Sequence, residues 1–352
     1  MGIIVFLIIL SILILVHEFG HFIAAKKNGV LVEEFGLGFP PRLFSIKKGE
    51  TIYSINILPL GGFVKVFGEE YHEKVENKER AFIYKKPWQK ALIIVSGVIG
   101  NLILAWFLLS YLATQGILIP TNKVVIEQVQ NKTPAQQAGL KVGDIIKTIK
   151  VDNKVKVVEK PEDLIKIANN KSGKEMLLNI KSSKGVEKTV RITARKDFPK
   201  DQGPLGISIS GSELRKYSIL QAPIVGLQLT FKYLILILAG FGGLFKSLIS
   251  FQKPAFEVAG PIGIAQFTGQ ALKIGQGALI EFTAALSLNL AVLNIIPFPA
   301  LDGGRLSFVL YEWITKRRIN KNFERGANAV GMLILLSLVF IITISDIIRI
   351  FK

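Results

Sequence analysis

Residues 2–25 read GIIVFLIILSILILVHEFGHFIAA, a run in which Ser11 is the one polar residue before position 17. A run of this length and composition predicts a helix that crosses a lipid bilayer. Ionisable side chains inside such a helix cost roughly 2.5–3.5 kcal/mol each, so those that are present are expected to serve a function. The stretch therefore predicts a membrane protein and the place of its chemistry.

The ionisable side chains of this run form the motif HEFGH, with His17 and His21 four residues apart and Glu18 between them. On a helix this spacing puts both imidazoles on one face, one turn apart, where they can hold one zinc ion. Glu18 would then be the base that accepts a proton from the attacking water. A chance occurrence of the pattern is the alternative, and the apolar surroundings of the motif argue against it.

The composition limits the class of protein and the type of metal site. Half of the 352 residues are apolar, which indicates an integral membrane protein rather than a pair of soluble domains. The net charge of +18 is spread over several segments without an aromatic-interleaved basic stripe, so no nucleic-acid partner is predicted. Because the chain has no cysteine, a metal has to be held by histidine and carboxylate.

The charges that flank the apolar runs predict their orientation. Lys26 and Lys27 follow the first span, 2–25, and no Lys or Arg precedes it, so the HEFGH end faces the cytoplasm and the N-terminus lies outside. A second span over 88–112 returns the chain to the outside and completes the first part of the membrane core, 1–115.

The loop between these spans predicts β-structure beside the membrane. Four apolar runs, at 31–35, 43–46, 52–58 and 63–67, are separated by turn residues and predict a membrane-associated β-meander over 31–67 on the cytoplasmic side. An edge of this sheet is expected to pair with an extended substrate. A plain surface hairpin is the alternative.

Residues 116–212 have the composition of a soluble domain, with eighteen Lys or Arg and ten Asp or Glu. The predicted topology places this domain outside the cytoplasm. Its segment TPAQQAGLKVGDIIKTI resembles the PDZ signature of bacterial membrane-linked proteases. A PDZ domain binds peptides by adding a strand to a sheet edge, so a peptide ligand is expected, and a spacer domain without a ligand is the alternative.

The second part of the membrane core, 213–352, is predicted to hold two further spans, over 277–296 and 329–344, which leave the C-terminus outside. The apolar stretch 220–250 is interpreted as an interfacial or re-entrant helix. If it crossed, the next span would carry Asp302 to the outer face, away from the HEFGH motif.

The span 277–296 ends in NIIPFPALDGG, which predicts the third metal ligand. Its prolines break the helix and its glycines allow a tight turn, and such irregular backbone is tolerated at membrane depth where it lines a cavity or packs on protein. Asp302 would complete a site for one zinc ion whose fourth position is open to water. A turn aspartate beside Gly303 is the alternative. His72, in a charged stretch, is interpreted as a surface histidine rather than a ligand.

The whole chain resembles the site-2 protease family, in particular the bacterial regulator-of-sigma-E protease subgroup. Six stretches carry the resemblance: HEFGH, FGLGFPPRL, PLGGFVKVFGE, GLKVGD, AGPIGIA and NIIPFPALDGG. The resemblance implies intramembrane proteolysis in the bacterial inner membrane. Its implied substrates are single-span proteins such as anti-sigma factors, or signal-peptide remnants.

The resemblance also implies roles for single residues. The two HEFGH histidines and Asp302 would bind zinc, Glu18 would be the catalytic base, and Asn289 and Asn294 would contact the substrate. Carboxamides can satisfy the amides that an extended substrate bares in lipid, although a helix–helix hydrogen bond is the alternative for Asn289. Two features depart from the family: one PDZ domain stands where some relatives carry two, and GVIGN at 97–101 lacks the proline of the usual GPxxN.

These observations predict an α-helical polytopic membrane protein with four transmembrane helices, a cytoplasmic-side β-meander and one inserted α+β PDZ domain outside. The predicted function is zinc-dependent intramembrane proteolysis. A catalytically inactive scaffold that binds partners through its PDZ domain is one alternative, and the intact site residues argue against it. A transporter is another, and no paired half-helices of an inverted repeat support it.

Overall fold

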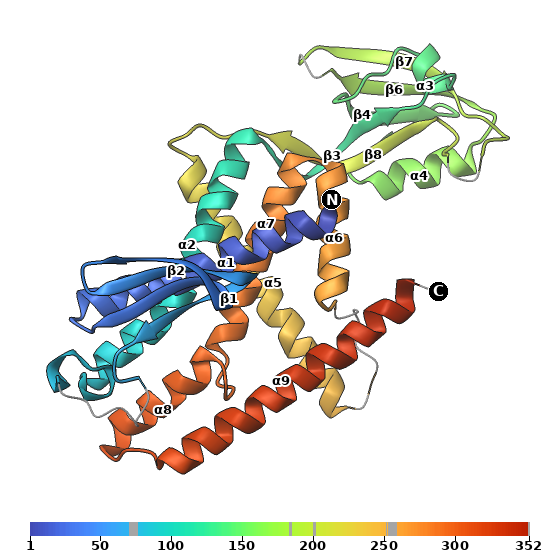
Figure 1. Cartoon of the computed structure of the whole chain (residues 1–352). Helices are drawn as coiled ribbons and strands as arrows, with labels where there is room; N and C mark the ends of the chain where they lie inside the picture. Colours follow the sequence, from blue (N-terminus) through green and yellow to red (C-terminus); the bar gives the residue numbers. More distant parts are fainter. Residues whose placement is uncertain (70–76, 183–184, 200–201, 251, 253–258, 351–352) are drawn as a thin grey trace. The chain divides into compact units, whose positions relative to one another are not determined.

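The computed structural model describes residues 1–69, 77–182, 185–199, 202–250, 252 and 259–350. The chain divides into two compact units (Figure 1). The larger unit joins Met1–Thr114 to Ser218–Lys352, and the smaller unit is Gln115–Tyr217. The smaller unit is thus an insertion between two halves of the larger one.

Five helices within the described part of the larger unit are long and apolar enough to cross a membrane: α1 (Gly2–Lys27), α2 (Pro87–Gln115), α5 (Ala222–Ile249), α7 (Gln276–Ile295) and α9 (Lys321–Ile350). They expose large apolar side chains such as Phe107 and Phe340, as a surface in contact with lipid requires. These helices agree with the prediction of a helical membrane protein. Four spans were predicted, and α5 is the additional candidate.

The helix α6 (Pro261–Ile274) changes the argument about α5. In Figure 1, α5 and α7 run in the same direction, and α6, which lies between them in the sequence, runs in the opposite direction. A crossing by α5 is therefore compatible with Asp302 and the HEFGH motif lying at one level. The argument from sequence against a crossing by α5 did not take the short helix α6 into account. An interfacial or re-entrant α5 stays a prediction.

The sheet of the larger unit consists of β1 (Val32–Lys48) and β2 (Thr51–Val66), each of which folds back on itself. Residues 34–37 lie opposite both 52–55 and 62–65, and 52–55 also lie opposite 44–47. The segments therefore lie side by side in the order 62–66, 32–37, 51–56, 42–48. The predicted β-meander is wrong in this respect, because a meander places successive segments next to each other. Segments 62–66 and 42–48 form the two edges.

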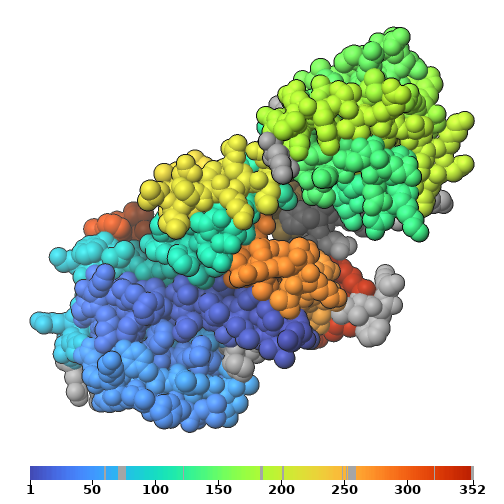
Figure 2. All heavy atoms as spheres, turned by 90° about the horizontal axis from the view of Figure 1, so that it is seen from above, coloured from blue at the N-terminus to red at the C-terminus, as the bar shows by residue number. Residues whose placement is uncertain are grey.

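A small core attaches this sheet to α1 and α2. Buried Ala25 of α1 and Ile93 of α2 pack with the strand residues Val32 and Val66. Figures 1 and 2 show the sheet, in light blue, lying along α1, in dark blue. Two short 3₁₀ helices, η1 (Lys78–Arg80) and η2 (Phe82–Tyr84), lead from the sheet to α2, and α8 (Asp302–Thr315) joins α7 to α9.

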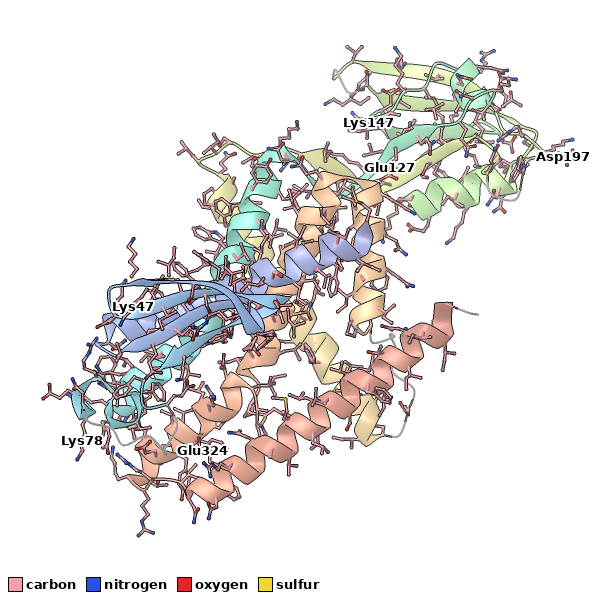
Figure 3. The ribbon with its side chains drawn as sticks, viewed as in Figure 1. Lys47, Lys78, Glu127, Lys147, Asp197 and Glu324 are labelled. Carbon is pink, nitrogen blue, oxygen red and sulfur yellow. The ribbon has the colours of Figure 1, made fainter. Side chains whose placement is uncertain are left out.

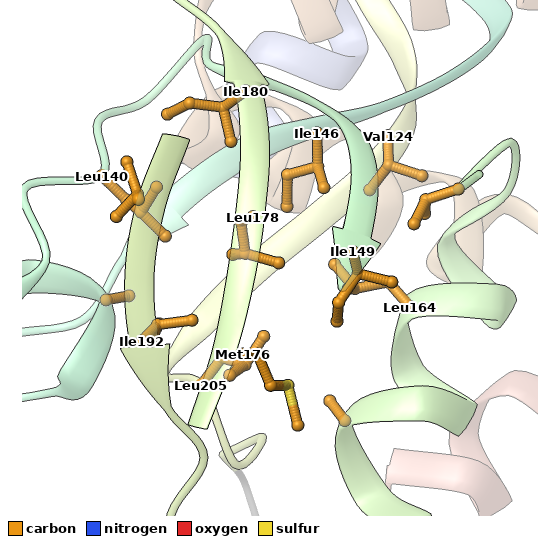
Figure 4. Close-up of a cluster of buried hydrophobic side chains, with 14 of the residues drawn as sticks. Val124, Leu140, Ile146, Ile149, Leu164, Met176, Leu178, Ile180, Ile192 and Leu205 are labelled. Carbon is orange, nitrogen blue, oxygen red and sulfur yellow. The ribbon is translucent and has the colours of Figure 1, made fainter. Parts of the chain in front are cut away.

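The smaller unit is a six-stranded sheet with two short helices: β3 (Ile117–Val129), α3 (Pro134–Gln137), β4 (Ile145–Val151), β5 (Lys154–Val157), α4 (Pro161–Asn170), β6 (Glu175–Lys181), β7 (Glu187–Thr193) and β8 (Ile207–Arg215). Its strand order is β7-β6-β4-β3-β8, with β5 paired to β4. Fully buried side chains such as Ile146, Leu178 and Leu164 form its core (Figure 4). The edge strand β8 packs beside α4. A PDZ fold for this unit stays a prediction.

Glycines set the close approach of α1 and α2. A Cβ atom on Gly20 would lie 2.2 Å from the carbonyl oxygen of Ser96, and one on Gly100 would lie 2.8 Å from that of Val16. These contacts are with backbone, which cannot move aside cheaply. The two helices therefore touch along a seam that requires glycine.

We predict that Gly20→Ala lowers the melting temperature of the purified protein in detergent by several degrees, since overpacking costs ~1–3 kcal/mol. Gly242→Ala is the matched control, because a Cβ atom on this glycine of α5 meets no atom within 4 Å. Its melting temperature should equal or exceed that of the wild type. Equal melting temperatures for the two variants would contradict the described seam.

Candidate active site

Three predicted metal ligands meet at one point of the larger unit. His17 and His21 lie on successive turns of α1, and Asp302 is the first residue of α8. Nε2 of His17 lies 2.9 Å from Oδ2 of Asp302 and 3.1 Å from Nε2 of His21, which lies 3.2 Å from the same oxygen. Two helices from opposite ends of the chain thus bring three ligand atoms together, although their role as ligands stays a prediction.

The hydrogen bonds of His21 show which of its two ring nitrogens carries the lone pair. Its Nδ1 lies 2.8 Å from the carbonyl oxygen of Ile93, and a carbonyl can only accept, so Nδ1 is the donor. In a neutral ring Nε2 then carries the lone pair, and it points at Asp302 and at Nε2 of His17. A cation shared by the three atoms would satisfy this arrangement.

The spacing of the three atoms fits a zinc ion. Tetrahedral bonds of 2.0–2.1 Å place neighbouring ligand atoms about 3.3 Å apart, close to the separations of 2.9–3.2 Å found here. Two imidazoles and one carboxylate are a donor set of hydrolytic zinc sites, which keep one position open. Among the described residues this is the group of histidine and acidic side chains that could hold a metal.

The carboxyl group of Asp302 is held in its charged form. Burial by itself raises the pKa of this carboxyl, but when the imidazoles beside it carry protons, their hydrogen bonds and positive charge outweigh burial and hold the pKa well below its usual value. A charged Asp302 is the form that binds a cation.

Prolines and glycines in the loop between α7 and α8 fix the position of Asp302. Helix α7 ends at Ile295, and Pro297 and Pro299 prevent it from continuing. A Cβ atom on Gly303 would lie 2.0 Å from the carbonyl oxygen of Ile296. This turn therefore requires glycine immediately after Asp302, which explains the sequence DGG.

Gly97 of α2 makes room for the two imidazoles. A Cβ atom at this position would lie 2.4 Å from Nε2 of His21 and 2.7 Å from Cε1 of His17. Helix α2 is unbroken from Pro87 to Gln115, so the missing proline of the GVIGN segment leaves a regular helix. A glycine is thus needed here because it lies against the ligands.

A cavity of about 420 Å³ opens beside the cluster. Glu18, His21 and Asp302 line it, together with strand residues Val64 and Val66. The Cγ atom of Glu18 would lie 3.6 Å from a Cβ atom on Gly62, so the edge segment 62–66 of β2 runs past the predicted base. The cavity leaves space for water beside the predicted ligands.

Ion pairs that sequence reasoning missed line the same cavity. Arg305 of α8 pairs with Glu69, which raises the pKa of the guanidinium, and Lys90 of α2 lies 3.0 Å from Glu312 of α8. Glu324, labelled in Figure 3, lies at the start of α9 and also lines the cavity. The cavity is therefore lined by charged side chains as well as by the predicted ligands. One sequence feature could have indicated these ion pairs: Lys90 is a charged residue within an apolar helix. Its side chain is buried in the structure.

The two predicted substrate-contacting asparagines differ in position. Nδ2 of Asn294 lies 3.5 Å from Nε2 of His17, so this side chain borders the cluster. Nδ2 of Asn289 donates to the carbonyl oxygen of Ala285 on its own helix, at 2.9 Å. His72 lies outside the described residues.

The sequence comparisons agree with this geometry. Residues 5–338 match the family model described as peptidase family M50. The chain belongs to peptidase family M50. The resemblance to the site-2 proteases is thereby confirmed.

Relatives of this M50 peptidase carry the printed name "Putative zinc metalloprotease". One from Clostridium perfringens is 37% identical over 99% of both chains, and one from Clostridium acetobutylicum is 33% identical over 99% of this chain and 97% of its own. One from Staphylococcus aureus is 30% identical over 99% of this chain and 98% of its own. The family and these names support a zinc-dependent protease of the membrane.

We predict that Asp302→Ala abolishes stoichiometric zinc binding by the M50 peptidase, because it removes one of three ligands. Metal analysis of protein purified in detergent measures this. Glu324→Ala is a control that changes an acidic residue of the same cavity and should retain wild-type zinc content. Equal zinc contents in all three proteins would contradict the assignment of Asp302.

Proposed function

We propose that this M50 peptidase is a zinc-dependent endopeptidase that cuts single-span membrane proteins within the bilayer. The observation that carries the proposal is the meeting of His17, His21 and Asp302 beside a cavity that Glu18 also lines. Two of these ligands lie on the apolar helix α1, which is long enough to cross a membrane. Ionisable groups at such a place are functional by default.

Each residue of the site has a distinct part in the proposed reaction. His17, His21 and Asp302 would hold one zinc ion, which when bound polarises the scissile carbonyl and makes water a better nucleophile. Glu18 accepts the proton of the attacking water and passes it to the leaving amine. The charged Asp302 balances positive charge, which lowers the cost of holding a cation in an apolar helix bundle.

The edge segment 62–66 is proposed to hold the substrate extended. A protease needs its peptide in an extended form, and a free sheet edge provides main-chain hydrogen bonds along such a peptide. This edge passes Glu18, so a strand added there would run beside the predicted base. Asn294, at the cluster, would satisfy amides of the substrate.

The proposed substrates are anti-sigma factors or signal-peptide remnants in the bacterial inner membrane. Lys26 and Lys27 at the end of α1 support an orientation with the site near the cytoplasmic face and both termini outside. The smaller unit, 115–217, would then lie outside and act as a PDZ domain that binds a peptide. Its edge strand β8 beside α4 supports this role.

A catalytically inactive scaffold is the rival function. It would bind partners through the smaller unit and would need no intact metal site. The convergence of the ligands, and the glycine at position 97 that makes room for them, favour the enzyme.

We predict that Glu18→Gln leaves zinc binding intact and lowers the cleavage of a reporter with one transmembrane segment by at least 10²-fold, the usual range for loss of a general base. Immunoblotting of the reporter, with metal analysis of the same preparation, checks both parts. An unchanged cleavage rate for this variant would contradict the proposed enzyme and favour the catalytically inactive scaffold.

Asn294→Ala is expected to reduce reporter cleavage more than Asn289→Ala, because Asn294 borders the metal cluster whereas the amide of Asn289 is bonded to its own helix. Initial rates at several reporter concentrations measure the difference. A larger loss at Asn289 would show that the side chain at the cluster is not the one that contacts the substrate.

A further inference from the structure

The loop between α7 and α8 has few hydrogen bonds of its own. Pro297 and Pro299 have no N–H group. The N–H of Phe298 donates to Ile296 at 2.7 Å, and that of Leu301 donates to Phe298 at 3.1 Å. The position of this loop decides where Asp302, the residue after Leu301, begins α8.

The remaining amide, that of Ala300, is bound by another helix. It donates to Oδ1 of Asn328 on α9 at 3.1 Å. Asn328 is partly buried and lines the same cavity as Asp302. A side chain of α9 thus holds the backbone two residues before the predicted ligand.

Ala300 has a conformation that requires such a contact. Its φ of +73° lies in the left-handed region, which a residue with a Cβ atom seldom adopts. Residues in this region persist where their surroundings hold them there. Without the bond to Asn328, relaxation of Ala300 towards negative φ would shift the backbone that leads to Asp302.

A second contact places α9 against the loop. A Cβ atom on Gly331 would lie 2.4 Å from the carbonyl oxygen of Pro299. Gly331 and Asn328 are three residues apart and therefore lie on one face of α9. The helix holds the loop by close packing at one residue and by a hydrogen bond at the other.

We propose that Asn328 is a positioning residue of the metal site: its bond to the amide of Ala300 holds the strained loop in the conformation that places Asp302 beside His17 and His21. The proposal rests on the proposed function, since it takes these three residues as zinc ligands. Asn328 acts through the loop and does not itself contact the reacting atoms.

The test compares zinc affinities, measured by competition with a chromophoric chelator, for the full-length protein in detergent. Asn328→Ala is expected to weaken zinc binding by about 10- to 100-fold, the effect of losing a partner that orients a ligand. Asn328→Asp keeps the acceptor oxygen and should bind zinc within about threefold of the wild type. Asn322→Ala, at an exposed position of the same helix, is the matched control and should bind like the wild type.

A second variant separates positioning from a general loss of structure. Ala300→Gly removes the Cβ atom that makes the positive φ unfavourable. Added to Asn328→Ala, it should recover a large part of the lost zinc affinity, whereas a merely structural role of Asn328 would leave the double variant as weak as the single one. The ratio of the two affinities also remains measurable if Asn328→Ala melts at a lower temperature than the wild type.

Two results overturn the proposal. One is wild-type zinc affinity in Asn328→Ala, and the other is a double variant no better than Asn328→Ala. Failure of the wild type and of Asn322→Ala to bind zinc at all would instead overturn the proposed function itself. The two failures are therefore distinguishable.

Discussion

Two imidazoles and a carboxylate have to meet inside an apolar helix bundle, and the larger unit depends on this constraint. His17 and Asp302 are 285 residues apart in sequence, yet their ligand atoms lie 2.9 Å apart. An isolated charge in such surroundings is expensive, so the carboxylate is stable there because the histidines face it. The features around the cluster follow from this requirement: glycine where α2 touches the imidazoles, prolines that end α7, and a helix start at the ligand itself.

The sheet meets a second requirement of the proposed reaction, a place where a substrate can lie extended beside the metal site. Its segment 62–66 is an edge, and this edge runs past Glu18 instead of pointing away from the site. In the proposed reaction, backbone amides of this edge would serve as a template for an extended chain, which the side chains of a helix cannot provide. The cavity, the predicted base and the strand edge therefore lie within one compact region beside the cluster.

Much of the site was predictable from local sequence because its chemistry is local. The i, i+4 spacing in HEFGH and the prolines and glycines around Asp302 have direct structural meanings, and the structure brings these residues together. The sheet was predicted as four strand segments but with the wrong neighbours, because the order depends on how β1 and β2 fold back, which no local pattern reveals. Asn328 was missed for a similar reason: a polar residue in an apolar helix is visible, but its partner Ala300 is set by tertiary packing.

The separation of the ligands in the sequence has a consequence for biosynthesis. A ribosome that adds 5–20 residues per second needs about 14–57 seconds to pass from codon 17 to codon 302. For the last 85 residues of that interval the nascent chain has the HEFGH helix and the whole inserted unit, 115–217, yet it lacks the carboxylate. The proposed metal site therefore forms late in synthesis, and a chain that stopped before Asp302 would lack one of its three predicted ligands.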